Sequence, residues 1–264
     1  MRWLDALIRS APRRDDAAVA QRMAAAYEAA GRGDYATALE LWRPLAHAGV
    51  ARAQNNIAAC FSEGLGVECD AKLAAQWLSL AAEAGDPVGQ RNYAALYFRG
   101  EGVEQNYDRA FELYRAAAEQ GDGPAQDMLS WMMLEGEIAA PDYVAARRWA
   151  EAAAAHGVAA AMTRLGMIFH NALGVERDPA QAVLWWRQAA ERGDGDGQAM
   201  LGAAYHLGAG IKQDPVEAYV WLLRARTAGS PLASQFFAAV RAALSPDEAA
   251  EAERRAAVPL PVST

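Results

Sequence analysis

The stretch Gly64–Asp86, GLGVECDAKLAAQWLSLAAEAGD, decides the fold because its pattern returns four more times along the chain. Trp77 has counterparts every 36 residues at Leu113, Trp149, Trp185 and Trp221. Gly85 returns in the same register at Gly121, Gly157, Gly193 and Gly229. No insertion or deletion interrupts the five copies. A fixed period in this range indicates a solenoid of stacked supersecondary units.

Each copy is predicted to contain two helices, which we call helix A and helix B. Helices A are expected at Arg52–Glu63, Val88–Arg99, Pro124–Glu135, Ala160–Asn171 and Asp196–Leu207. Apolar residues recur along them at four-residue steps, as Ile57 and Phe61 do, which places them on one face. Gly208 and Gly210 are expected to have positive φ, because glycine ends a helix in the left-handed conformation without steric cost. Helices B are expected to begin at the N-caps Asp70, Asn106, Asp142, Asp178 and Asp214.

Several details of the regular units carry expectations of their own. Asp214 and Glu217 have the spacing of a capping box. Residues 138–141, IAAP, replace the usual Gly-Val turn of the third unit, so that turn must be built differently. In the fourth unit Ala172 replaces the first turn glycine, and either departure could change the local curvature. The tryptophan stripe is interpreted as core packing, with Trp185 buried between its own helix A and the next unit.

The regular units occupy about residues 50–229, and looser copies flank them. Residues 16–49 are predicted to be a degenerate N-terminal cap and residues 230–257 a C-terminal cap, so a single solenoid would span 16–257 before a tail, 258–264. Residues 1–15 form an amphipathic N-terminal segment. In it, residues 1–14 place apolar side chains between arginines, which fits folding back onto the first helices, contact with a partner, or weak peripheral contact with a membrane.

Composition excludes several classes of protein. The chain of 264 residues carries a net charge of −8, which argues against nucleic-acid binding because such proteins usually present a basic face. Its two cysteines do not recur with the repeat, so no disulfide scaffold is expected. No stretch approaches the ~20 apolar residues of a membrane helix, and the N-terminus lacks the apolar region of a signal peptide. These features predict a soluble cytoplasmic protein.

The unit A-Q-x-x-[IL]-A/G-x-x-[FY]-x-x-G-x-G-V-x-x-D-x-x-x-A-x-x-W-x-x-x-A-A-x-x-G-D resembles the Sel-one-like repeat (SLR), a relative of the tetratricopeptide repeat with a longer turn between its helices. The resemblance implies an all-α fold: a right-handed superhelical solenoid of stacked antiparallel helix pairs, about seven including the caps, with helices A lining a concave face. It also implies adaptor or scaffold roles, commonly in bacterial regulation, envelope biogenesis and signalling. Some cysteine-rich secreted members have been called penicillin-binding or β-lactamase-like. Their regular cysteines are missing here, so that activity is not carried over.

The sequence offers no recognisable catalytic chemistry. It lacks Ser-x-x-Lys, G-x-S-x-G, H-E-x-x-H and P-loop patterns. His170 and His206 occupy equivalent positions, but no carboxylate or thiolate stands at that position in the other units, so both are interpreted as structural or groove-lining. We therefore predict no catalytic, cofactor-binding or metal-binding residues and no cofactor. A metal-dependent or other hydrolase is kept as an alternative from a different class.

Binding specificity is expected where the units differ. By analogy with tetratricopeptide grooves, four positions of each helix A point into the concave face. The candidate partner-binding residues are Asn55, Asn56, Arg91, Asn92, Phe98, Asp127, Met128, Trp131, Leu134, Arg164, Met167, His170, Met200 and His206. We predict an apolar anchor near Trp131 and polar recognition near Arg91 and Asn92, because methionine and aromatic groups in a groove mark protein or peptide sites. Burial of several of these side chains by superhelical curvature is the alternative.

Together these features predict a non-enzymatic scaffold or adaptor that holds a protein or peptide segment on its concave face. The expected partner is a protein or peptide, without nucleic acid and without an integral membrane segment. An alternative is an immunity protein that neutralises a secreted toxin, a role that an acidic SLR surface would also serve.

Overall fold

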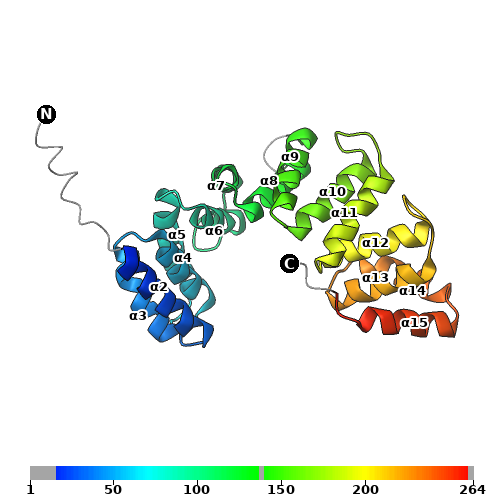
Figure 1. Cartoon of the computed structure of the whole chain (residues 1–264). Coiled ribbons are helices and arrows are strands. Elements are labelled where there is room, and N and C mark those ends of the chain that lie inside the picture. Colours follow the sequence, from blue (N-terminus) through cyan, green and yellow to red (C-terminus); the bar gives the residue numbers. More distant parts are fainter. Residues whose placement is uncertain (1–15, 137–139, 261–264) are drawn as a thin grey trace, which may run out of the picture. The chain divides into compact units, whose positions relative to one another are not determined.

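The computed structural model describes residues 16–136 and 140–260, and within these ranges every regular element is an α-helix (Figure 1). The helices follow one another in tandem, as the repeat predicts. Their bounds are α2 Asp16–Gly31, α3 Tyr35–His47, α4 Ala51–Glu63, α5 Ala71–Glu83, α6 Pro87–Arg99, α7 Tyr107–Glu119, α8 Gly123–Glu135, α9 Tyr143–Ala155, α10 Ala159–Asn171, α11 Pro179–Glu191, α12 Gly195–Leu207, α13 Pro215–Thr227, α14 Ala233–Ala242 and α15 Pro246–Ala257. The predicted amphipathic segment 1–15 lies outside the described residues.

The helices of the described ranges fall into two compact units. Unit 1 runs to Ala116 and unit 2 begins at Ala117, within α7. In unit 1, α2 packs on α3 and α4 on α5, and in unit 2, α8 packs on α9, α10 on α11 and α12 on α13. Helices A are α4, α6, α8, α10 and α12, and each begins one residue earlier than predicted. The prediction of an all-α solenoid of tandem helix pairs is confirmed.

Small residues on helices B set the closeness of the packing. The fourth residue of helix B is an alanine with no exposed surface in every regular unit: Ala74, Ala110, Ala146, Ala182 and Ala218. The same holds near the end of helix B for Ala81, Ala117, Ala153, Ala189 and Ala225. A side chain this small lets neighbouring helix backbones approach, and close packing of this kind makes even one added methylene costly.

The tryptophan stripe is less buried than predicted, which corrects the assignment of the core. Trp77, Trp149 and Trp185 are only half-buried, although Trp185 packs against a buried cluster of unit 2, and Trp221 alone is buried. The deeper position is the next residue of each helix B. It is occupied by Leu78, Tyr114, Ala150, Trp186 and Leu222, none more than 4 % exposed. A one-residue step turns a helix by about 100°, so the neighbouring position points more directly into the core.

In unit 2 a large buried side chain packs directly against a glycine of the neighbouring helix. Trp186 is 2 % exposed, and its Nε1 donates to the Thr163 carbonyl at 3.2 Å. A Cβ placed on Gly166 would lie 2.2 Å from that nitrogen, a distance that real contacts do not reach. In unit 1 the equivalent pair is Ala58 and Leu78. The indole ring of Trp186 therefore occupies the space that a side chain at Gly166 would fill.

The turns between helix A and helix B follow the glycine prediction. Gly208 and Gly210 have φ of 69° and 75°, so both adopt the left-handed conformation. Ala172 adopts it too, at φ 58°, so the substitution in the fourth unit keeps the local helix end. In the third unit Gly136 ends α8 at φ 71°, a signal that the sequence reading missed, while Ile138 and Ala139 lie outside the described residues.

The predicted caps of helices B are present, with one correction. The N-caps Asp70, Asn106, Asp142, Asp178 and Asp214 each accept a backbone N–H three residues later. Asp214 and Glu217 do not form a capping box, because the Glu217 carboxylate pairs with Arg255 of α15. The capping box lies instead at Ser245 and Glu248, which begin α15.

Candidate functional site

The predicted groove residues lie on helices A of two separate units. We call the surface of α4 and α6 the unit 1 A face; it carries Asn55, Asn56, Arg91, Asn92 and Phe98. We call the surface of α8, α10 and α12 the unit 2 A face; it carries Asp127, Met128, Trp131, Leu134, Arg164, Met167, His170, Met200 and His206. Each face is described by itself.

Two asparagines join neighbouring helices on the unit 1 A face. The Asn92 Nδ2 atom donates to Asn55 Oδ1 at 2.7 Å, and Arg91 Nε donates to Asn92 Oδ1 at 3.3 Å. A pocket of about 250 Å³ opens beside this amide pair, lined by Asn55, Ala59, Ser62, Glu63, Leu78, Asn92, Ala95, Leu96 and Arg99. The pocket therefore combines amide, hydroxyl and charged groups with apolar side chains.

The other two predicted residues of this face are partly turned inward. Phe98 packs against Tyr107 with ring centroids 5.2 Å apart and is half-buried. The Asn56 Nδ2 atom is buried and has no hydrogen-bond partner among the described residues. The structure therefore brings Asn55, Arg91 and Asn92 together through hydrogen bonds, and all five predicted residues of this face are half-buried.

An ion pair joins α8 to α10 on the unit 2 A face. Arg164 Nη2 and Nε donate to Asp127 Oδ1 at 3.0 and 3.2 Å. The two side chains are 17 % and 13 % exposed, so water screens this pair only in part. Sequence reasoning named both residues as recognition groups without predicting their pairing. The pairing leaves the charge of Arg164 balanced within the protein.

The apolar residues of the unit 2 A face differ in accessibility. Met167 is 43 % exposed and is the most exposed of the predicted apolar residues on this face. Met128 and Trp131 are half-buried. Leu134 and Met200 are half-buried and pack against the buried clusters of the unit. Packing thus encloses part of the predicted apolar set, and Met167 is the most exposed member of that set.

The two equivalent histidines pack against aromatic rings. His170 lies 5.4 Å from the Trp186 ring, and His206 lies 6.1 Å from Phe236. Burial lowers the pKa of His170, and the nearby positive charge of Arg177 lowers it further. No group of three or more His, Cys, Asp or Glu side chains able to hold a metal occurs among residues 16–136 and 140–260. Ring packing accounts for both positions.

A second pocket lies between α10 and α12, and sequence reasoning missed its acidic side. It has a volume of about 150 Å³ and is lined by Ala160, Thr163, Arg164, Met167, Asp194 and Asp196. Asp194 Oδ1 caps α12 through the Gly197 N–H and accepts the Thr163 hydroxyl, both at 2.7 Å. Asp196 Oδ1 accepts the Ser230 hydroxyl at 2.6 Å. The Gly-Asp that closes the first, second and fourth repeats was the available signal for Asp194.

Two further repeated contacts hold helices A in place. A buried glutamine donates to a carbonyl at the end of the preceding helix B at Gln54, Gln90, Gln126 and Gln198. A side chain in each described turn also donates to a carbonyl seven residues earlier, near the end of helix A: Cys69, Gln105, Arg177 and Gln213. The third unit has Pro141 at this position, which has no such donor.

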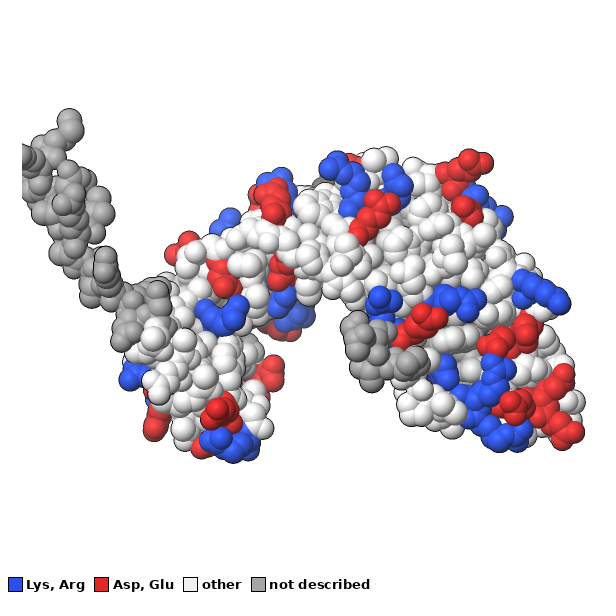
Figure 2. All heavy atoms as spheres, viewed as in Figure 1, with Lys and Arg blue, Asp and Glu red and all other residues white. Residues whose placement is uncertain are grey.

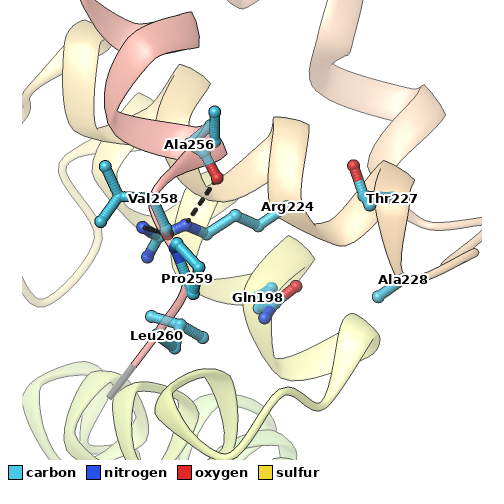
Figure 3. A pocket seen from close by; sticks show the side chains of 9 residues that line it. Gln198, Arg224, Thr227, Ala228, Ala256, Val258, Pro259 and Leu260 are labelled. Atoms are coloured by element: carbon cyan, nitrogen blue, oxygen red, sulfur yellow. Dashed lines mark hydrogen bonds between the residues drawn. The ribbon is translucent and has the colours of Figure 1, made fainter.

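The C-terminal cap forms a pocket of its own at the end of unit 2 (Figure 3). It has a volume of about 280 Å³ and is lined by Gln198, Arg224, Thr227, Ala228, Ala256, Ala257, Val258, Pro259 and Leu260. Arg224 Nη2 donates to the carbonyls of Arg255 and Val258 at 3.0 and 3.1 Å. A cation suits these free carbonyls at the end of α15. The arginine therefore docks the cap, and none of the predicted binding residues lines this pocket.

The repeat can now be compared with known proteins. The family model of the Sel1 repeat matches residues 51–86, 87–122, 123–158, 159–194 and 195–230. The chain belongs to the Sel1 repeat family. Members of this family are generally protein-interaction scaffolds and are typically not enzymes. No match was found among curated protein sequences.

Solved structures of other Sel1 repeat proteins show the same architecture. The chain is similar to a Sel1 repeat protein from Oxalobacter formigenes, with 28% identity, 90% of this chain and 97% of that chain covered, and a TM-score of 0.80. A putative Sel1 repeat protein from Klebsiella pneumoniae shares 21% identity over 76% of this chain and 97% of that chain, with a TM-score of 0.51. The immunity protein Pa5087 from Pseudomonas aeruginosa shares 20% identity over 78% and 79%, with a TM-score of 0.49, which supports no functional argument.

The surface of this Sel1 repeat protein is charged without a broad patch of one sign on the face in view. Figure 2 shows Lys and Arg interspersed with Asp and Glu there. None of the helices in the two described ranges has an apolar stretch long enough to span a lipid bilayer.

Proposed function

We propose that this Sel1 repeat protein is a non-enzymatic adaptor that binds a protein or peptide segment through its A faces. The observation that carries the proposal is the position of two pockets between neighbouring helices A, lined largely by residues that differ from unit to unit. Positions that recur strictly, such as Ala74 and its counterparts, are fully buried. The variable residues are thus the ones that reach a partner.

The size of the pockets favours a macromolecular partner over a small molecule. Their volumes are about 250 Å³ on the unit 1 A face and about 150 Å³ on the unit 2 A face. Sites for small ligands usually enclose about 300–1,000 Å³ and bury most of the ligand. Each shallow pocket of this size fits one side chain of a partner. A protein or peptide can place side chains in several such pockets and so gain its affinity from several contacts.

The chemistry of the two A faces differs. On the unit 1 A face, the Asn55–Asn92 amide pair offers donors and acceptors to the main chain of a bound segment. On the unit 2 A face, Met167 and Trp131 offer apolar surface, and methionine adapts to partners of varied shape. We assign polar recognition to Arg91 and Asn92 and apolar anchoring to the region of Trp131. We propose that the protein acts in the cytoplasm.

The test needs a partner isolated on the full chain by pull-down and identified by mass spectrometry. We then expect Trp131→Ala to weaken binding at least tenfold, because an aromatic anchor commonly contributes about 2 kcal/mol or more. Trp149→Ala is the matched control, since Trp149 is also half-buried but lies on α9, a helix B. Circular dichroism checks that both variants keep their helical content.

Unchanged affinity for both Trp131→Ala and Arg91→Ala would move the binding site away from the A faces. Equal losses for Trp131→Ala and Trp149→Ala would indicate a general effect on folding, and would equally count against the proposal.

A further inference from the structure

The helices of the unit 2 A face carry more acidic than basic groups. Helices α8, α10 and α12 with their N-caps contain five carboxylates and a single arginine, a net charge of −4. The carboxylates are Asp122, Asp127, Glu135, Asp194 and Asp196. That arginine, Arg164, is bound to Asp127. Within these three helices and their N-caps, carboxylates therefore outnumber cations.

The helices B of the same unit carry more arginines than the helices A. Helices α9, α11 and α13 contain five arginines: Arg147, Arg148, Arg187, Arg224 and Arg226. Counted with their N-caps, these helices also carry six carboxylates and have a net charge of −1, so the acidic excess is larger on helices A. A partner that meets helices A meets negative charge, and complementary charge steers association and selects between partners.

The pocket between α10 and α12 concentrates this charge beside apolar surface. Asp194, Asp196 and Met167 all line it. Arg164 also lines the pocket, but its guanidinium donates two hydrogen bonds to Asp127. The pocket together with Asp127 thus has three carboxylates and one guanidinium. Both a negative end and an apolar wall are available to one incoming side chain.

The volume of the pocket suits a single long side chain. About 150 Å³ corresponds to roughly five water molecules at ~30 Å³ each. Lysine and arginine combine an aliphatic stem, which packs on apolar surface, with a charged end group. These are the side chains whose two parts match Met167 and the two aspartates.

We propose that the pocket between α10 and α12 receives a lysine or arginine side chain of a basic segment in the protein partner. The stem lies on Met167, and the charged group is held by Asp194 and Asp196. This inference rests on the proposed function, since it names the partner chemistry that one A face selects.

The test measures binding of designed peptides to the purified full chain by fluorescence anisotropy. The probe is a fluorescein-labelled twelve-residue peptide that alternates lysine and leucine, and its matched forms carry glutamate or glutamine in place of lysine. We expect the lysine form to bind at least tenfold more tightly than either matched form. Added salt should weaken its binding, because partly exposed charge pairs are screened.

The variant that tests the site is Asp196→Asn, which removes one negative charge but keeps a carbonyl acceptor for the Ser230 hydroxyl. Its matched control is Glu191→Gln, which removes one charge from the exposed surface of α11 in the same unit. We expect Asp196→Asn and Met167→Ala each to weaken the lysine peptide at least fivefold and Glu191→Gln to leave it within twofold. Asp194 is left intact, since it caps α12.

Three results would overturn the inference. One is preferential binding of the glutamate peptide. Another is an equal effect of Asp196→Asn and Glu191→Gln, which would indicate unspecific attraction to an acidic protein. A third is a natural partner whose binding depends on Trp131 but not on Asp196, which would leave the proposed function intact. If the binding of the natural partner depends on neither Trp131 nor Arg91, the proposed function itself fails.

Discussion

Replacement of Trp186 by alanine tests the packing of α10 on α11 in depth. Trp186 is 2 % exposed, so the mutation removes a completely buried indole ring and its hydrogen bond to the Thr163 carbonyl. Removal of a buried tryptophan costs about 3–5 kcal/mol. At roughly 2–4 °C per kcal/mol for a chain of this size, the midpoint of thermal unfolding should fall by about 10 °C.

The adjacent Trp185 provides the matched control. It is half-buried, so Trp185→Ala removes less buried area and should lower the midpoint by about half as much or less. Both midpoints are measured by circular dichroism at 222 nm, and the urea midpoint gives an independent comparison. If Trp185→Ala is as destabilising as Trp186→Ala, the assignment of the deep core position to Trp186 is wrong.

A double substitution checks the same contact from the other side. Gly166→Ala alone should destabilise by about 1–3 kcal/mol, because the new Cβ would meet the Trp186 ring. Combined with Trp186→Leu, it recreates the Ala58–Leu78 pair of unit 1. The double variant should therefore be more stable than the sum of the single effects predicts. Simple additivity would contradict the proposed complementarity.

Two further predictions concern a turn and a titrating group. Gly210→Ala should destabilise by more than about 1 kcal/mol, because φ is positive and the new Cβ would lie 2.1 Å from the Pro179 carbonyl oxygen. Gly193→Ala, with positive φ but open space around it, should cost less, and denaturant midpoints compare the two. His170 has a lowered pKa, so the unfolded chain takes up its proton first as the pH falls below the ordinary value of about 6.5. The stability that neutral His170 contributes to the fold is therefore complete above that pH and declines as the pH falls toward the lowered pKa of the folded state. His170→Gln should accordingly lose less stability than wild type between pH 7 and pH 5. A larger loss for the variant would refute the assignment.

Much of the fold follows from the repeat, because each repeated signal has a local physical cause. Asp70 and its counterparts cap helices B through their own side chains, and Gly208 ends α12 through its own backbone freedom. Such features need no distant partner, so spacing alone predicts them. The helix bounds agree to one residue for the same reason.

The remaining features depend on contacts between units that a single period does not reveal. Trp185 and Trp186 are adjacent in sequence, and only the position of α10 decides which ring is enclosed. Arg164 and Asp127 look like free recognition groups until their helices are placed side by side. The acidic side of the α10–α12 pocket was overlooked because Asp194 reads as a helix cap, a role that it also has.

The most direct test of the account is hydrogen–deuterium exchange of the full chain with and without its isolated partner. The account predicts that the partner slows exchange in peptides from helices A, including α8, α10 and α12, and leaves exchange in helices B, such as α9 and α11, unchanged. Protection confined to helices B or to the C-terminal cap would contradict it.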